Sequence, residues 1–216
     1  MDFAPMSAEA QQHLTLKHQA RERALPKSRQ AIRNAANAIR AAHRADFPQA
    51  EKLLGESGRL LSEMAADLRG HLDIYYAGFV ADAQKEYAEA AITVALIRGQ
   101  TVPMPGTLGV EWAPYLNGLG EACGELRRHV LDRMRQGHLE GCDRILDTMD
   151  DIYSALISLD FPDAITGNLR RTTDSVRGIV EKTRGDLTFG ANEARLSALV
   201  ESLDGRISDL LKKLHG

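Results

Sequence analysis

The chain has 216 residues, of which 44% are hydrophobic and only 5% aromatic, and its formal net charge is −3 at pH 7. This length allows one sizeable core, and a composition rich in aliphatic but poor in aromatic side chains favours helix packing over a β-sandwich. The sequence pI of about 6.2 excludes a global basic field, so any binding of nucleic acid has to come from local clusters of positive charge.

Several classes of protein are disfavoured by motifs that the sequence lacks. It has no signal-peptide h-region and no apolar run near the roughly 20 residues that cross a bilayer, so we expect a cytoplasmic protein that does not contact membranes. The two cysteines, Cys123 and Cys142, have no metal-ligand spacing and are expected to be buried thiols. P-loop, Rossmann and Ser or Cys nucleophile signatures are absent, and no histidine forms the Glu-x-x-His pair of ferritin-like dimetal oxidases.

The first predicted element is a long basic helix. Residues 1–7 form a loose start with Ser7 as a candidate N-cap, and the helical pattern then runs to about residue 44. Pro26 lies inside this pattern and removes a backbone donor, so we expect a kink or a break just before it. Acids are nearly absent between residues 23 and 44. Such local positive charge is typical of phosphate contact, but an ordinary basic surface helix explains it equally well.

Six further helices follow from the spacing of apolar residues and the positions of Gly and Pro, at residues 50–69, 71–98, 111–136, 138–159, 160–184 and 192–214. A loop at 99–109 leaves room for the third and fourth helices to pack antiparallel, and another loop is expected between Gly185 and Gly190. The fourth helix contains three interior glycines, which indicates close approach of another backbone or a ligand. The last helix repeats leucines at close to 3.5 residues, so it packs either on its own domain or on another subunit.

Two pairs of glutamates are the candidate functional residues. Glu86 and Glu89 are three apart in DAQKEYAEA, and Glu121 and Glu125 are four apart in YLNGLGEACGELRR. Either spacing places both carboxylates on one helix face, among apolar or small neighbours. Carboxylates held there are costly unless a positive charge compensates them, and an all-oxygen set suits Mg²⁺ or Mn²⁺ rather than zinc.

A second interpretation treats the four glutamates as surface residues whose ion-pair partners are Lys85, Arg127 and Arg128. Spacing alone leaves both interpretations open. A further acidic run is expected to pair with arginines rather than to bind metal, and it consists of Asp147, Asp150 and Asp151.

Four segments resemble, in this order along the chain, the translin and translin-associated factor X (TRAX) family: KEYAEA, YLNGLGEACGELRR, MDDIYSALISLDFPDAITGNLRR and DSVRGIVEKTRGDL. The resemblance covers about residues 21–187 and is closer to the catalytic factor X side. It implies a single all-α domain over residues 1–216, folded as a seven-helix translin-like bundle. It also implies a hollow homo-octamer that handles nucleic acid inside.

The resemblance further implies a site and its residues. The factor X side carries a metal-dependent endoribonuclease site of acidic residues, and the corresponding catalytic residues and metal ligands here are Glu86, Glu89, Glu121 and Glu125. Glu121 stands where the catalytic members have Asp, so its longer side chain changes where a metal ion can sit. In this family the first helix contributes to the nucleic-acid surface, and the contacts expected here are Arg21, Lys27, Arg29, His43 and Arg44.

We therefore expect a Mg²⁺-dependent endoribonuclease, with Mn²⁺ as an alternative ion, that binds and cleaves single-stranded or short RNA inside an oligomeric shell. The alternative is a non-catalytic protein that binds single-stranded RNA or DNA, in which the glutamates are structural or vestigial. A scaffold without a nucleic-acid role is the third hypothesis. No aromatic residues interleave with the bases of the first helix, so recognition is expected to rest on backbone charge rather than base sequence.

Overall fold

The computed structural model describes residues 2–214, which form nine α-helices and no β-strand. The six long helices are α1 (Ala4–His43), α2 (Phe47–Asp67), α4 (Gly78–Ile97), α6 (Trp112–Arg135), α7 (Cys142–Ile157) and α9 (Leu169–Leu214). The three single-turn helices are α3 (Leu72–Tyr75), α5 (Pro105–Leu108) and α8 (Asp163–Thr166). The all-α prediction is confirmed. None of the described helices combines the length and the apolarity that a membrane span requires.

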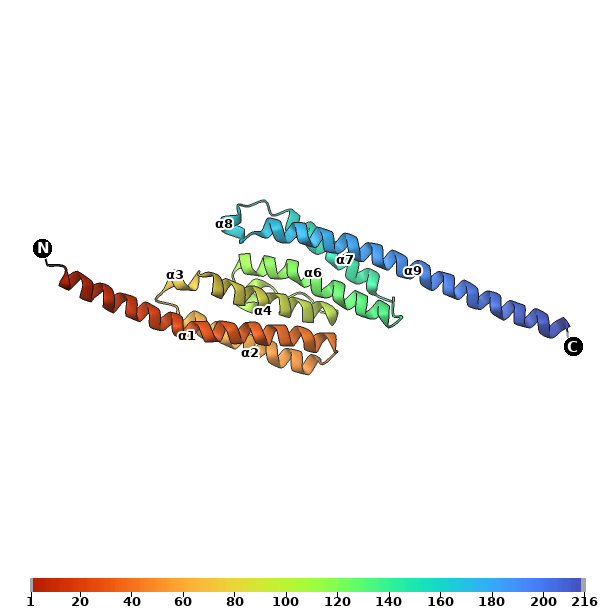
Figure 1. The fold of residues 1–216 in the computed structure, drawn as a ribbon, viewed down its shortest axis with the longest axis horizontal. Helices are drawn as coiled ribbons and strands as arrows, with labels where there is room; N and C mark the ends of the chain where they lie inside the picture. The colour runs from red at the N-terminus through yellow and green to blue at the C-terminus, as the bar shows by residue number, and fades with distance from the viewer. Residues whose placement is uncertain (1, 215–216) are drawn as a thin grey trace.

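The long helices pack in three layers, α1 with α2, α4 with α6, and α7 with α9 (Figure 1). One apolar core joins the first two layers and includes Ala31, Leu61 and Ile92. A second core joins α6 to the third layer and includes Leu126 and Met149. The α4–α6 pair is therefore covered on both sides, and it carries all four candidate glutamates.

Helices α4 and α6 lie parallel, which corrects the expected antiparallel arrangement (Figure 1). The backbone N–H of Glu111, the N-cap of α6, donates to the side chain of Gln84 near the start of α4 (3.1 Å). The connection between them, which includes α5, returns along α4, and Tyr115 ties it down by donating to the carbonyl oxygen of Pro103 (3.0 Å). As a result, the two acidic motifs lie at the same height in the bundle.

Two glycines of α6 allow this close packing. A Cβ atom on Gly118 would lie 2.6 Å from the carbonyl oxygen of Lys85 in α4, and one on Gly120 would lie 2.4 Å from Thr172 Cγ2 in α9. The close approach predicted from the interior glycines is thus confirmed at these two positions. Gly124 differs, because nothing lies within 4 Å of the corresponding Cβ position.

Helix α1 begins earlier than predicted and is not broken. Its N-cap is Phe3, and Ser7 lies inside the helix with its N–H bonded to the carbonyl oxygen of Phe3 (3.0 Å). The helix continues through Pro26, which is exposed, while Ala24 and Ser28 on either side are buried. Packing of this alanine-rich face against α2 and α4 compensates for the single lost backbone bond.

The predicted division of the chain into seven helices differs from the structure at three other places. Segment 71–98 is divided into α3 and α4, and segment 160–184 begins with the separate turn α8, after which Gly167 and Asn168 adopt left-handed backbone angles. Conversely, the loop expected between Gly185 and Gly190 is absent, because α9 continues through both. At Gly190 the missing side chain makes room for packing, since an added Cβ would lie 2.7 Å from Met134 Cε.

Both end helices extend beyond the bundle, and the termini lie at opposite ends of the molecule (Figure 1). All residues of α9 from 191 onward whose side chains are described are exposed. They include the predicted leucine stripe, for example Leu196, Leu199, Leu203 and Ile207. The leucine stripe therefore does not pack on its own domain, which was one of the two predicted alternatives.

Candidate metal site and cleft

Three of the four predicted glutamates come together between α4 and α6. Glu86 and Glu89 project from α4 and Glu121 from α6, and one carboxylate oxygen of each lies within 4.8 Å of the others. We call these three residues the acidic cluster. The close packing at Gly118 holds α6 against this part of α4, because an added Cβ there would also lie 2.9 Å from the backbone nitrogen of Glu89.

Glu89 is a partly buried member of the acidic cluster. Burial raises the pKa of its carboxyl group to about 8, and the charges of Glu121, Glu86 and Glu125 act in the same direction. Lys85 opposes this shift by favouring the ionised carboxylate. A carboxylate in this position gains from any further cation, because the cation compensates both the lost hydration and the repulsion.

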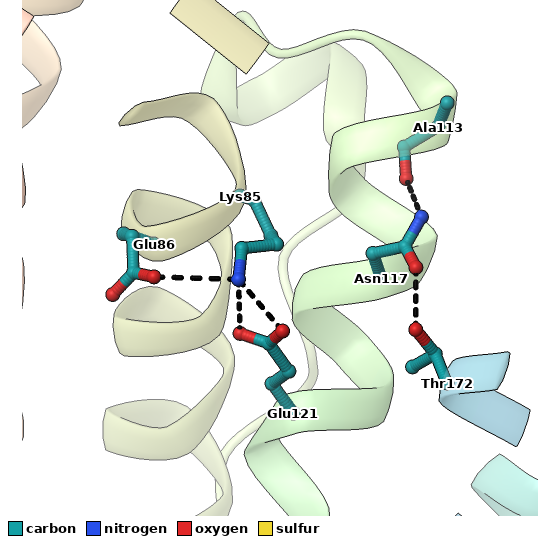
Figure 2. A network of polar contacts seen from close by, with 6 residues as sticks. All are labelled: Lys85, Glu86, Ala113, Asn117, Glu121 and Thr172. Atoms are coloured by element: carbon teal, nitrogen blue, oxygen red, sulfur yellow. Dashed lines mark hydrogen bonds and ion pairs between the residues drawn. The ribbon is translucent and has the colours of Figure 1, made fainter. Parts of the chain in front are cut away.

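Lys85 lies between Glu86 and Glu121, two members of the acidic cluster (Figure 2). Its Nζ atom donates to both carboxylate oxygens of Glu121 at 2.6 Å and lies 3.3 Å from Oε1 of Glu86. Burial by itself lowers the pKa of the ammonium group, but the hydrogen bonds and charge of Glu121, followed by those of Glu86, outweigh burial and leave the pKa raised. Lys85 is therefore a charged internal partner of two of the three carboxylates.

Glu125, the fourth predicted residue, faces a different helix. Its Oε2 atom lies 2.5 Å from Nε2 of His43 at the end of α1, and Arg128 approaches the same oxygen at 3.8 Å. The hydrogen bond with His43 is the largest cause of the lowered pKa of this carboxyl group. His43 is almost fully buried, and its Nδ1 atom has no hydrogen-bond partner within the described part of the chain. Glu125 thus borders the acidic cluster without joining it.

The second interpretation of the glutamates, pairing with nearby bases, holds in part. Lys85 pairs with Glu121 and Glu86, and Arg128 approaches Glu125, whereas Arg127 instead pairs with Asp186 of α9 (2.7 Å). The expected arginine pairing of the other acidic run is confirmed for Asp150, which accepts from Arg184.

The acidic cluster opens into a cleft of about 830 Å³ between α4, α6 and α9, which we call the central cleft. Lys85, Glu89 and Glu121 lie on one wall, and Arg171 and Thr172 of α9 lie on the other. Arg171 forms no ion pair among residues 2–214 whose contacts are described. The cleft therefore combines a negative wall with an available positive group opposite it.

Asn117 holds the α9 wall of the central cleft in place (Figure 2). This buried side chain donates to the carbonyl oxygens of Ala113 (2.9 Å) and Thr166 (2.8 Å), and its Oδ1 accepts from the hydroxyl of Thr172 (2.6 Å). It therefore joins α6 to the end of α8 and to the beginning of α9.

Most of the bases predicted to contact nucleic acid have partners within the protein. Lys27 pairs with Asp67 and Glu63, and the hydrogen bond with Asp67 is the largest cause of its raised pKa. Arg21 pairs with the adjacent Glu22, and His43 is buried against Glu125. Arg29 and Arg44 are exposed, and no ion pair involves them within the described residues.

The sequence does not mark Lys85 or Arg171 as residues of the central cleft, although both line it. Lys85 lies inside the first acidic motif, directly before Glu86, and the sequence suggests only an ion-pair role for it. Arg171 belongs to a run of bases at residues 170–184, in which Asp174 and Glu181 are nearby acids that could pair with it. In the structure Glu181 pairs with Arg177 instead. The one available signal was the excess of bases over acids in residues 170–184.

Together these features define an all-α protein that holds a candidate divalent-metal site in a cleft between its helical layers. No family model matches the chain. It is 31% identical, over 186 residues, to the uncharacterized protein MJ0175 of Methanocaldococcus jannaschii, with 83% of this chain and 81% of that protein covered.

Solved structures of C3PO proteins are also similar to this chain over most of its length. The crystal structure of AfC3PO matches with a TM-score of 0.81 and 31% identity, covering 88% of this chain and 99% of that one. AfC3PO solved with duplex RNA matches with a TM-score of 0.80 and 30% identity, covering 88% and 98%. Apo-NeC3PO, at 20% identity, a TM-score of 0.76 and coverage of 86% and 96%, supports the fold alone. The chain belongs to the C3PO/translin family.

Proposed function

We propose that this protein is a metal-dependent endoribonuclease whose site is the acidic cluster. The observation that carries the proposal is the convergence of Glu86, Glu89 and Glu121 from two helices, with oxygens within 4.8 Å of one another. Glu89 and Glu121 also line the central cleft. Structural ion pairs on a surface do not need a partly buried carboxylate whose pKa is raised to about 8, as that of Glu89 is. A substrate-accessible site of this kind is where perturbed pKa values are expected.

The residues present fit Mg²⁺, with Mn²⁺ as the alternative. The ligand set consists of carboxylate oxygens only, which suits a hard ion. A divalent ion would compensate the negative charge that these three carboxylates carry when ionised. When bound, such an ion would lower the pKa of an attacking water and neutralise charge on the phosphodiester.

The other residues of the site would orient the substrate and move a proton. Glu125 is kept ionised by His43 and lies at the edge of the acidic cluster, where its carboxylate would orient the attacking water or accept its proton. Arg171, on the opposite wall of the central cleft, would bind a backbone phosphate. Contacts of this type do not read bases, so cleavage is expected to be largely independent of sequence.

RNA is the proposed substrate because a relative at 30% identity has been solved with duplex RNA. Single-stranded and short RNA, which the sequence predicts, and duplex RNA are compared directly in the test below. We further propose a homo-oligomer, with the octamer implied by family resemblance as the expected state. The exposed leucine stripe of α9 supports association, because single helices with such a stripe bury it against another surface.

The test is cleavage of fluorescent single-stranded and duplex oligoribonucleotides in Mg²⁺, Mn²⁺ or EDTA. We expect metal-dependent cleavage by the natural protein and a loss of at least about 100-fold in Glu89→Gln, since general acid–base and metal-ligand groups contribute effects of this size. RNA binding and oligomeric state should be retained. Glu9→Gln is the matched control, because Glu9 is an exposed glutamate of α1 far from the cleft. Cleavage that persists in EDTA, or in Glu89→Gln, contradicts the proposal.

The alternative function is binding of single-stranded RNA or DNA without catalysis. The observation that favours it is Lys85, which already supplies positive charge to two of the carboxylates. The same assay separates the two functions, because a binding protein retards the labelled oligonucleotides but gives no product with either ion.

A further inference from the structure

The position of Lys85 has a consequence for how a metal ion can enter the acidic cluster. The ammonium group is bonded to both oxygens of Glu121 and lies near Oε1 of Glu86, at 2.6, 2.6 and 3.3 Å. A magnesium-sized ion has to approach such oxygens to about 2.1 Å. An ammonium group and a divalent ion also repel each other strongly at these separations. The ion therefore has to separate Lys85 from Glu121 before it binds.

The displaced ammonium group has a place to go. Lys85 lines the central cleft together with Arg171, and its four-carbon side chain is flexible. Released from Glu121, it would lie between the acidic cluster and the opposite wall of the cleft, where a substrate phosphate must also lie. A phosphate oxygen is the natural new partner of a desolvated ammonium group.

We propose, on the basis of the function proposed above, that Lys85 is an exchangeable internal cation. It occupies Glu121 and Glu86 while metal is absent, competes with the divalent ion for them, and on displacement binds a backbone phosphate of the nucleic acid in the central cleft. Metal and nucleic acid then bind cooperatively, because each favours the position of Lys85 that the other requires. By thermodynamic linkage the coupling is the same in both directions.

The test measures Mn²⁺ binding to the full-length protein by electron paramagnetic resonance, with no nucleic acid and no turnover. Lys85→Met removes the competing charge and is expected to bind Mn²⁺ about tenfold tighter or more, since a single nearby charge changes such equilibria by one to three powers of ten. Lys85→Arg keeps the charge and should bind no tighter than the natural protein. Lys52→Met is the matched control, since Lys52 is an exposed lysine of α2.

A second measurement tests the phosphate contact. At saturating Mn²⁺, Lys85→Met should raise the KM for a fluorescent oligoribonucleotide several-fold, while Lys52→Met leaves it unchanged. An oligonucleotide that is not cleaved should tighten Mn²⁺ binding in the natural protein and do so less in Lys85→Met. The opposite signs of the two effects, tighter metal and weaker substrate, distinguish exchange from a merely structural role.

Loss of the positive charge between Glu121 and Glu86 can impair folding. The third variant is therefore Lys85→Gln, which keeps a hydrogen-bond donor for Glu121. Thermal unfolding of this variant and of the natural protein is measured with and without Mn²⁺. We expect Mn²⁺ to raise the Tm of Lys85→Gln more than that of the natural protein. Equal or weaker Mn²⁺ binding in all three Lys85 variants overturns the exchange, even if cleavage remains metal-dependent. Failure of the natural protein to bind Mn²⁺ at all, or cleavage in EDTA, instead overturns the proposed function itself.

Discussion

Glu121 and Glu125 are one turn apart on α6, yet their surroundings differ in nearly every respect. Glu121 faces α4, where it meets Lys85 and two further carboxylates beside the central cleft. Glu125 faces the end of α1 and is bonded to the buried His43. The same residue type on the same helix face thus becomes part of a charge-dense cluster at one position and of a closed pair at the other. The neighbouring helix, rather than the spacing along the sequence, decides which.

The largest contrast is expected in catalysis and metal binding. Glu121→Gln and Glu125→Gln should each reduce RNA cleavage by about 100-fold or more, but for different reasons. Only Glu121→Gln should also weaken Mn²⁺ binding, because Glu125 lies outside the acidic cluster. Cleavage assays combined with paramagnetic resonance of bound Mn²⁺ check this. Equal loss of Mn²⁺ affinity in both variants would show that Glu125 turns away from His43 and joins the ligands.

Glycine substitutions beside the two glutamates should have opposite effects on stability. Gly118→Ala forces a Cβ atom to within 2.6 Å of the Lys85 carbonyl oxygen, and overpacking of this kind costs about 1–3 kcal/mol. Gly124→Ala meets nothing within 4 Å and should stabilise the helix by up to about 1 kcal/mol. Urea unfolding of both variants measures the difference. A similar change in both would mean that α4 and α6 are not in backbone contact in solution.

The pH dependence of stability should differ between Glu89 and Glu125. The pKa of Glu89 is raised from 4.5 to about 8 in the folded protein, so the folded state binds the extra proton and stability falls as pH rises from about 5 to 8. The pKa of Glu125 is lowered, so its contribution is present above about 4.5 and is lost as the pH falls further.

Thermal unfolding of the metal-free protein between pH 4 and 9 tests both signs. Glu89→Gln should flatten the decline on the alkaline side, and saturating Mg²⁺ should oppose it because the ion favours the ionised carboxylate. Stability that rises from pH 5 to 8 in the metal-free protein contradicts the environment described for Glu89.

The smallest effect is expected from His43→Leu. The substitution removes the hydrogen bond to Glu125 and should cost about 1 kcal/mol, because this carboxylate is still partly exposed. The pKa of Glu125, followed by carbon NMR, should return toward its ordinary value. His18→Leu, at an exposed position of α1, serves as the control. An unchanged pKa of Glu125 would be inconsistent with the pairing.

The helices and the acidic motifs could be predicted because both depend on local sequence. Apolar periodicity indicated each long helix, and the interior glycines of α6 correctly indicated close packing at Gly118 and Gly120. The continuity of α9 could not be predicted, because a glycine that ends one helix serves as a packing surface in another, as Gly190 does against Met134. Tertiary contact overrides propensity at such positions.

The sequence predicted which glutamates belong to the candidate site, but not which residues interact with them. Four carboxylates on two helices were identified, but the partner of Glu125 is 82 residues away in sequence, and no local pattern marks it. The parallel arrangement of α4 and α6 depends equally on distant contacts, such as that of Glu111 with Gln84. The role of Lys85 could not be predicted either. Its position beside Glu86 in the sequence indicates an ion pair, but does not show that the ammonium group would compete with a metal ion.

The outer part of α9 has a consequence for measurements on this protein in dilute solution. Residues 191–214 would extend roughly 36 Å past the bundle as a helix with an exposed apolar face. Most of the stability of a helix in a protein comes from packing of its apolar face, which this segment lacks within one chain. This segment should therefore unfold before the bundle does. If identical molecules associate through it, its unfolding temperature should rise with protein concentration. Circular dichroism of a dilution series would then measure self-association as well as helix content.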